Sequence, residues 1–278
     1  MIAGISAAAA LVGVGMTGCS ATSEPGDAAS STSFTLTGNP IVATPHGDPI
    51  RISNLSYPRY ELHVGQPYIL PGYEGEKDYI VTPKAIGEAH GRHWVDLTVT
   101  FANGDVFSFR SYQRVDADTM PSDLGGRTSI LLDGTRGSGT EGTVTLGIHN
   151  SSSTGVLDPN SPQREKYVQT RPTGTQEWTI PLSRNFWAGT LNVGGDLGDD
   201  SNGDYSVFVG FNAVANRVSG PDLGLSASIE CYPGDSYTVS PVGTFTLKGY
   251  TPSGEAPPTD PAKVGYSPGQ MRVQLKWS

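Results

Sequence analysis

The stretch 270–277, Gln-Met-Arg-Val-Gln-Leu-Lys-Trp, decides the fold class. Every second residue from Met271 to Trp277 is apolar, and the residues between them are polar or charged. Such strict alternation is typical of a β-strand that buries one face and leaves the other in water. We therefore predict a strand here, with its apolar side chains in a protein core.

The same period of two recurs from Phe34 onward, and no stretch of twelve residues carries apolar positions at helical spacing. Gly, Pro, Asn or Asp residues bound each alternating run. We predict an all-β fold, an antiparallel β-sandwich of the jelly-roll or immunoglobulin-like kind. The runs used for this prediction are 95–101, 144–148, 178–182, 205–211 and 225–231.

A proline-containing segment, 157–163, divides the predicted strands into two groups. A β lobe over 34–156 and a second β lobe over 164–278 fit this division, and one larger sheet assembly fits it as well. Asn103-Gly104 marks a β-hairpin. Apolar matching predicts a bulged three-residue loop that sets Phe101 opposite Phe107 and Val99 opposite Phe109.

Composition limits the class of partner. The chain of 278 residues has 18 Lys and Arg against 27 Asp and Glu, a formal net charge of −9. No cluster of basic residues is present, and phosphate backbones require one. We therefore expect no nucleic-acid partner. The 36 glycines and 21 prolines indicate a globular chain with many turns.

The first residues have the pattern of an export signal. Residues 2–14 are apolar or small and uncharged, a run too short for a comfortable membrane span. Met16-Thr-Gly-Cys19 resembles the lipobox of bacterial lipoproteins, and 20–33 is rich in Ser, Thr, Gly, Asp and Pro. The resemblance implies a signal peptide over 1–18, lipid on Cys19, a flexible tether over 19–33 and an extracytoplasmic, membrane-anchored place in the cell envelope. The alternative is an unprocessed Ala/Gly-rich arm.

The second cysteine, Cys231, alternates with Ala227 and Ile229 on the apolar side of a predicted strand. With Cys19 carrying lipid, no intramolecular disulfide can form. We predict a buried, unreactive thiol. The common motifs for nucleophilic, phosphate-binding and zinc-dependent catalysis are absent, so we predict no catalytic residue and no enzyme activity.

An acidic loop is the candidate metal site. It contains Asp199, Asp200, Asn202 and Asp204, and the last three have the one-three-five spacing of a calcium loop. Tyr205 and Phe211 stand where an EF-hand has its Gly and its Glu, which excludes a typical EF-hand. An irregular Ca²⁺ site and a solvated acidic turn both remain open; otherwise we expect no cofactor.

The segment 181–249 is similar to the MspA-type porins of mycobacteria. The similarity rests on Pro181–Trp187 before a strand, on the acidic loop, and on 225–229 leading to Pro233-Gly234. It implies a homo-oligomeric channel subunit in which the acidic loop lines the pore constriction. A ring of carboxylates selects for cations.

Aromatic residues form the candidate ligand-binding set. Trp178, Trp187 and Tyr205 have amphipathic rings that suit a stacking platform for sugars, and packing in the core is the alternative. The leading hypothesis is a lipid-anchored envelope β-sandwich that binds a protein or glycan ligand, or has a structural role, without catalysis. The rival hypotheses are the porin subunit and a jelly-roll coat protein of a particle.

Overall fold

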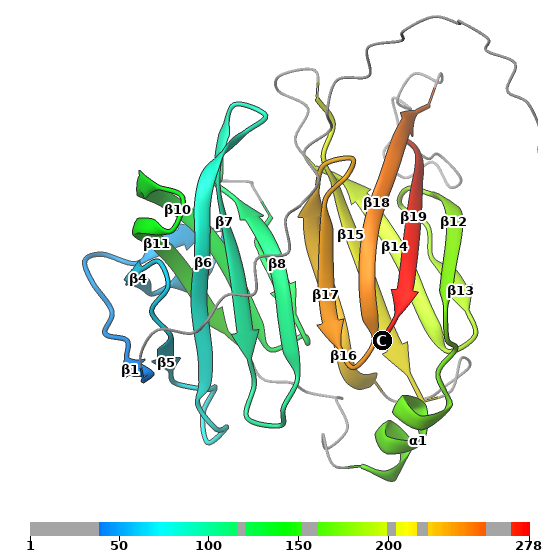
Figure 1. Cartoon of the computed structure of the whole chain (residues 1–278), viewed down its shortest axis with the longest axis horizontal. Helices are drawn as coiled ribbons and strands as arrows, with labels where there is room; N and C mark the ends of the chain where they lie inside the picture. Colours follow the sequence, from blue (N-terminus) through cyan, green and yellow to red (C-terminus); the bar gives the residue numbers. More distant parts are fainter. Residues whose placement is uncertain (1–38, 116–119, 152–160, 199–203, 216–221, 254–267) are drawn as a thin grey trace, which may run out of the picture. The chain divides into compact units, whose positions relative to one another are not determined.

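The computed structural model describes residues 39–115, 120–151, 161–198, 204–215, 222–253 and 268–278 (Figure 1). Most of these residues lie in β-strands, and the strands pair antiparallel except at the short edge strand β1 (Ile41–Val42). The prediction of an all-β, sandwich-like fold is therefore confirmed. The predicted signal peptide and tether, 1–18 and 19–33, lie outside the described residues.

Two large sheets contain almost all the strands (Figure 1). The nine-stranded sheet has the order β1, β5 (Tyr68–Leu70), β6 (Tyr79–Ala89), β7 (Arg92–Thr100), β8 (Val106–Tyr112), β17 (Ser236–Ser240), β18 (Gly243–Pro252), β19 (Gly269–Trp277) and β12 (Thr175–Pro181). The eight-stranded sheet has the order β13 (Phe186–Ala188), β14 (Leu191–Leu197), β15 (Val207–Val214), β16 (Asp222–Cys231), β9 (Ser122–Leu124), β10 (Thr128–Ser138), β11 (Glu141–Asn150) and β4 (Arg59–His63). A separate hairpin pairs β2 (Ile50–Ile52) with β3 (Leu55–Tyr57).

Both sheets contain strands from both halves of the sequence. In each sheet the strands before residue 151 form one block and the strands after residue 174 form the other. The blocks join where β8 pairs with β17 in one sheet and where β16 pairs with β9 in the other. The ranges 34–156 and 164–278 are thus linked by backbone hydrogen bonds in both sheets.

Alternating strands supply the core. In β19 the side chains of Met271, Val273 and Leu275 are fully buried, while Arg272 and Lys276 on the opposite face are exposed. Phe211 of one sheet stacks on Phe245 of the other with 4.6 Å between ring centroids, so the sheets pack face to face. Each buried side chain of this size stabilises the fold by about 1.5–3 kcal/mol.

The register of the β7–β8 hairpin differs from the predicted one. The structure sets Val99 opposite Phe107 and Leu97 opposite Phe109, so the predicted pairs Phe101–Phe107 and Val99–Phe109 were wrong by two residues. A shift of two keeps every side chain on its face. Phe101 still packs edge-on against Phe107, with 5.5 Å between ring centroids.

Local hydrogen bonds explain this register. The predicted three-residue loop is present as 102–104, because Phe101 N–H donates to the Asp105 carbonyl. The Asn103 side chain accepts from Asp105 N–H and donates to Oδ2 of the Asp105 side chain, and Gly104 adopts φ +88°. This φ is one that glycine tolerates at a bulge.

Helix α1 (Pro162–Thr170) interrupts the strands, and the sequence pattern gives no sign of it. Ser161 caps it, since its Oγ accepts a hydrogen bond from Arg164 N–H, and Pro162 occupies the first turn. Its buried residues are Arg164 and Tyr167 rather than an apolar stripe. Within the described residues, the helical structure is too short and too polar to cross a membrane.

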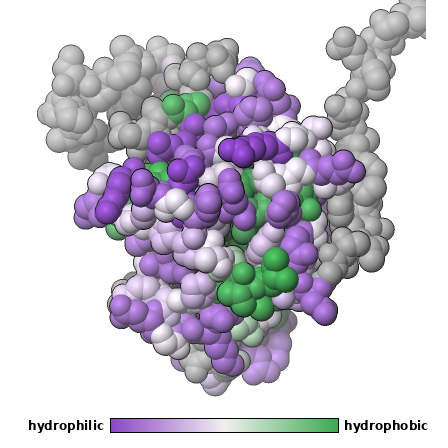
Figure 2. Space-filling model, turned by 90° about the vertical axis from the view of Figure 1, so that its left-hand side faces the viewer, coloured by the Kyte–Doolittle hydropathy of each residue, from purple (hydrophilic) through white to green (hydrophobic). Residues whose placement is uncertain are grey.

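Apolar side chains are exposed at one edge of the nine-stranded sheet. Ile41 and Val42 of β1 are 49% and 73% exposed. The space-filling view of this side of the molecule shows an apolar patch among polar residues (Figure 2).

Candidate functional site

A groove lies on the outer face of the eight-stranded sheet, over β14 and β15. Val193 and Phe211 pair across these strands and point into the core, so their neighbours in the chain point outward. At the next outward position Gly194 lies opposite Gly210. Because neither glycine has a side chain, the sheet surface is hollowed there, with a volume of about 200 Å³.

Amide side chains line the groove. Asn192 lies opposite Asn212 one step along the same face, and Asn185 and Ser228 complete the polar rim. The Oδ1 atoms of Asn192 and Asn212 are buried and have no hydrogen-bond partner. A buried acceptor without a donor costs about 1–3 kcal/mol. The groove therefore has two acceptors that a ligand with hydroxyl groups would satisfy.

The amides can turn toward such a ligand at small cost. The terminal torsion of an Asn side chain has a broad energy profile, so rotation of the amide plane requires little free energy. Directly opposite side chains on antiparallel strands have Cβ atoms about 5 Å apart, which suits two hydroxyl groups of one sugar ring. The two amides can therefore form hydrogen bonds with a neutral polar group.

Trp187 extends the row of Asn192 and Asn212. It pairs with Asn192 in the β13–β14 ladder, so its side chain leaves the sheet on the same outer face. Ser226 is opposite Asn212 at the other end of the row. An indole ring beside amide groups is a combination that supplies both stacking and hydrogen bonding.

One wall of the groove is a tight turn. Ser183 adopts φ +57°, its backbone N–H donates to the Gly195 carbonyl, and its Oγ donates to Oδ1 of Asp196. These bonds hold Asn185 over Gly194, where an added Cβ would lie 3.1 Å from Asn185 Oδ1. A Cβ on Gly210 would have nothing closer than 3.5 Å. The groove is thus closed at Gly194 and open at Gly210.

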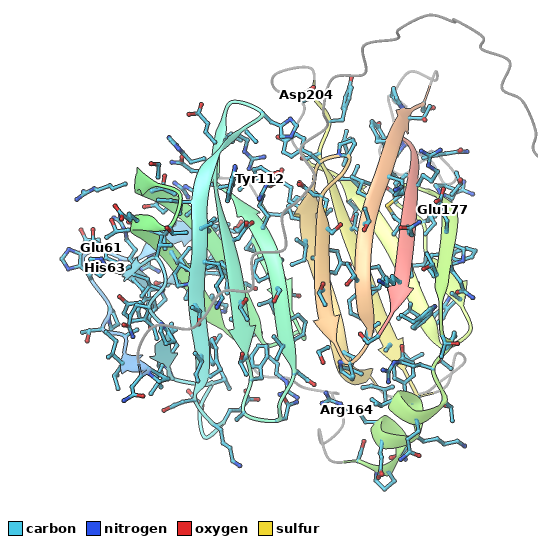
Figure 3. All side chains as sticks on the ribbon, in the orientation of Figure 1. Glu61, His63, Tyr112, Arg164, Glu177 and Asp204 are labelled. Carbon is cyan, nitrogen blue, oxygen red and sulfur yellow. The ribbon has the colours of Figure 1, made fainter. Side chains whose placement is uncertain are left out.

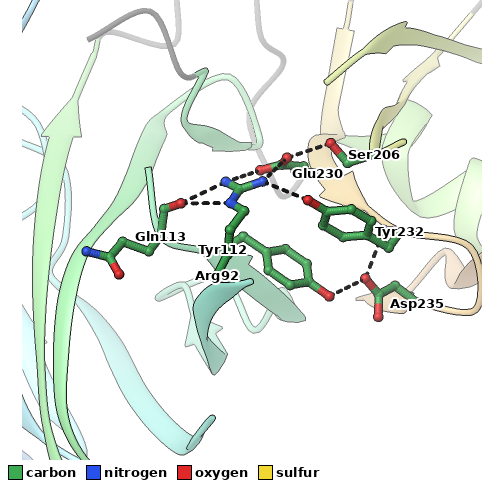
Figure 4. Close-up of polar contacts among 7 residues, drawn as sticks. All are labelled: Arg92, Tyr112, Gln113, Ser206, Glu230, Tyr232 and Asp235. Carbon is green, nitrogen blue, oxygen red and sulfur yellow. Dashed lines mark hydrogen bonds and ion pairs between the residues drawn. The ribbon is translucent and has the colours of Figure 1, made fainter. Parts of the chain in front are cut away.

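A buried polar cluster lies beside this region, between the two blocks of strands (Figure 4). The Arg92 guanidinium donates to both carboxylate oxygens of Glu230 at 2.6 and 3.0 Å and to the Gln113 carbonyl. Ser206 Oγ also donates to Glu230, at 2.6 Å. Burial alone lowers the pKa of Arg92, but the hydrogen bonds and charge of Glu230 outweigh burial and raise it.

Aromatic hydroxyls complete this cluster. Tyr232 accepts from Arg92 at 3.3 Å, and Tyr112 donates to Asp235 at 2.7 Å (Figure 4). Burial and the charge of Asp235 raise the pKa of Tyr112. The His90 ring stacks on Tyr232 with 3.8 Å between ring centroids. Every member is paired and buried or packed, so we assign the cluster a role in joining the two blocks of strands.

The residues of the predicted metal site are largely outside the described part of the chain. This applies to Asp199, Asp200 and Asn202. Asp204 is described: its side chain is 62% exposed and pairs with Nδ1 of His90 at 3.0 Å (Figure 3). The described residues contain no group of three His, Cys, Asp or Glu side chains that could hold a metal ion. The Ca²⁺ site stays a prediction, as does lipid on Cys19, which is also outside the described residues.

The three aromatic residues predicted to bind ligand lie in different surroundings. Trp178 of β12 packs half-buried against the core and lies 5.8 Å from Phe186, measured between ring centroids. Tyr205 is 36% exposed and lies 5.2 Å from Tyr250. Only Trp187, of the three, stands in the row of Asn192. The predicted buried thiol, Cys231, is 2% exposed.

Sequence reasoning missed the groove residues. Gly194, Gly210, Asn192 and Asn212 occupy polar-side positions of alternating runs, where Thr, Lys or Glu is more usual on a solvated strand. Gly and Asn are depleted in β-strands, so two strands with both residues on the polar side were a signal of an unusual strand surface. Only the register shows that the four residues meet.

Comparisons with known proteins add no relative. No protein-family model matches the chain, and neither the curated proteins nor the solved structures contain a significant match.

Proposed function

We propose that the protein is a lipid-anchored cell-envelope β-sandwich that binds a neutral glycan in the groove over β14 and β15 and catalyses no reaction. The observation that carries this proposal is the pair of buried, unpartnered amide oxygens of Asn192 and Asn212 beside the paired glycines. Sugar hydroxyls are donors that satisfy these oxygens, and the indole of Trp187 offers a ring for stacking.

Charge favours a neutral ligand over an anionic one. Asp196 is the charged residue among those lining the groove, and its carboxylate is exposed. A phosphate or carboxylate ligand would be repelled by Asp196 and would find no positively charged side chain in the lining. Neutral hydroxyl groups are not repelled by Asp196 and do not need a positively charged partner.

The test is calorimetric titration of the purified chain with neutral oligosaccharides of glucose, mannose, galactose and arabinose. We expect Trp187→Ala and Asn212→Ala each to weaken binding at least tenfold, because each removes one half of the recognition surface. Trp178→Phe is the matched control and should bind as the unmodified protein does, since Trp178 packs against the core. Binding that survives both groove substitutions would refute the glycan site.

The anchor is tested separately. The lipobox resemblance at Met16–Cys19 and the polar residues after it support attachment through the Cys19 sulfur. Cys19→Ala should move the protein from the membrane fraction to the soluble fraction when the two are separated by centrifugation. Unchanged partitioning of this variant would remove the anchor from the proposal while leaving the groove unaffected.

A further inference from the structure

A second pocket lies at the seam between β8 and β17, and it shares no lining residue with the groove. Three segments form it: the 103–105 loop before β8, the segment 161–169 that contains most of α1, and Ser240-Pro241 at the end of β17, where Ser240 lies opposite Val106. Figure 3 shows Arg164 on α1 at this end of the two strands. The pocket has a volume of about 580 Å³, within the range of small-molecule sites.

A buried ion pair forms one wall of this pocket. Arg164 and Asp105 are 5% and 6% exposed, and Nη2 of Arg164 donates to Oδ1 of Asp105. The other carboxylate oxygen, Oδ2, accepts from the Asn103 amide at 2.8 Å. Both oxygens of Asp105 are therefore satisfied.

The guanidinium of Arg164 is not satisfied. Its Nη1 atom is buried and has no hydrogen-bond partner. A buried charged group with an unpaired donor is costly, and guanidinium nitrogens cannot lose their protons to avoid the cost. A ligand that placed an acceptor atom against Nη1 would remove this penalty.

The charges around the pocket select the type of acceptor. The lining contains one positive side chain, Arg164, and two negative ones, Asp105 and Glu165. An anionic ligand would therefore enter a region with a formal charge of −1 and be repelled. Val168 and Pro241 add apolar contacts, and Gln169 adds a polar one. A neutral amide, with a carbonyl oxygen for Nη1 and a small apolar group beside it, fits this lining.

We propose that this pocket binds a secondary amide, the group shared by the peptide backbone and by acetamido sugars, through a hydrogen bond from Arg164 Nη1 to its carbonyl oxygen. The site is independent of the glycan groove. It shares no residue with the groove, so either site can fail without the other.

The experiment is an amide-proton NMR titration of the full chain with three probes. These are N-acetylglucosamine, N-acetylalanine N-methylamide and inorganic phosphate. We expect at least one of the two amide probes to shift the backbone signals of Gly104 and Gln169. N-acetylalanine N-methylamide has no hydroxyl group, so it should leave the signals of Gly194 and Gly210 in place. The amide probe that binds more tightly shows whether the natural ligand is an acetamido sugar or a peptide. Inorganic phosphate should bind at least tenfold more weakly than that probe.

Two variants make the test specific. Arg164→Lys keeps a positive charge for Asp105 but removes the second terminal nitrogen, and it should weaken amide binding at least tenfold. Gln169→Trp fills the mouth of the pocket from an exposed position on α1 and should abolish binding even if Arg164→Lys proves unstable. Lys166→Trp, exposed on the same helix and outside the pocket lining, is the control that should bind normally. Equal binding by Gln169→Trp, stronger binding of phosphate, or no response to either amide would each overturn the proposal.

Discussion

Arg92 on β7 and Glu230 on β16 form a bidentate ion pair across 138 positions of sequence, and both residues are almost fully buried. Because β7 belongs to the nine-stranded sheet and β16 to the eight-stranded sheet, the pair connects the two sheets as well as the two blocks of strands. If either residue were replaced by an uncharged one, the other would remain as an uncompensated charge in the protein interior.

The first prediction is that Arg92→Ala lowers the free energy of unfolding by about 3–5 kcal/mol, because Glu230 would remain buried without its counter-charge. Urea unfolding at neutral pH measures this change. Arg272→Ala is the matched control. It removes an ion pair with Glu177 in which the side chains are 56% and 42% exposed, so its cost should stay below about 1 kcal/mol. Equal costs for the two variants would show that Arg92–Glu230 does not join the blocks.

The second prediction concerns a tyrosine and alkaline pH. Burial raises the pKa of Tyr167 to about 12, and its hydroxyl has no hydrogen-bond partner. A tyrosine in the unfolded chain titrates near 10, so between pH 10 and 12 the unfolded state binds fewer protons than the folded state. The stabilisation from neutral Tyr167 is complete below pH 10 and is lost as pH rises toward 12.

Tyr167→Phe should therefore be at least as stable as the unmodified protein at pH 7, because it removes a buried hydroxyl that has no partner, and at pH 11 it should lose about 1 kcal/mol less. Tyr237→Phe is the contrast at pH 7. Its hydroxyl donates to the Val209 carbonyl at 3.1 Å, so removing it should cost about 1 kcal/mol. Chemical unfolding at the two pH values measures both. A large loss from Tyr167→Phe at pH 7 would contradict the unpaired hydroxyl.

Alternation along the chain predicted the strands β7, β11, β12, β15, β16 and β19 and the buried face of each. Met271, Val273 and Leu275 illustrate this, because burial of one face of a strand imposes a period of two. Which strands pair with each other could not be predicted in this way. The β8–β17 and β16–β9 pairings join residues more than 100 positions apart, and no local pattern specifies them.

The groove, too, could be predicted only in part. The sequence places Asn192 and Asn212 on the solvent side of two strands, but only their register sets them opposite each other. Helix α1 escaped prediction for a related reason. Its buried residues, Arg164 and Tyr167, are polar, so the helix carries no apolar periodicity, and the Asp105 contact that holds it is non-local. The hairpin register was missed because side-chain bonds of Asn103 and Asp105 determine it.

The third prediction uses the two cysteines together. Burial, with the nearby charges of Asp235 and Glu230, raises the pKa of the Cys231 thiol, so it should not react with a thiol reagent in the folded protein. Protein extracted from membranes with lipid on Cys19 should then show no reactive thiol when folded and one after unfolding. The Cys231→Ala variant should show none in either state. A fast-reacting thiol in the folded, membrane-extracted protein would mean that Cys19 is unmodified.

The fourth prediction separates the glycine that opens the groove from a glycine that the fold needs. A Cβ on Gly210 would meet its nearest neighbour at 3.5 Å, so Gly210→Ala should fold with little change in stability while its methyl group fills the groove floor. A Cβ on Gly195 would lie 2.7 Å from Met271 Sδ and 2.8 Å from the Phe208 carbonyl, so Gly195→Ala should cost about 1–3 kcal/mol.

The substitution that costs little stability, Gly210→Ala, should have the large effect on oligosaccharide binding. Gly210→Ala should weaken oligosaccharide binding at least tenfold, because the methyl group occupies space that the sugar ring requires. Gly249→Ala, on a strand of the other sheet with nothing within 4 Å of the added Cβ, should bind and unfold as the unmodified protein does. Calorimetric titration and urea unfolding of these variants measure both quantities. A Gly210→Ala protein that binds oligosaccharide with full affinity would show that the ligand does not enter between the paired glycines.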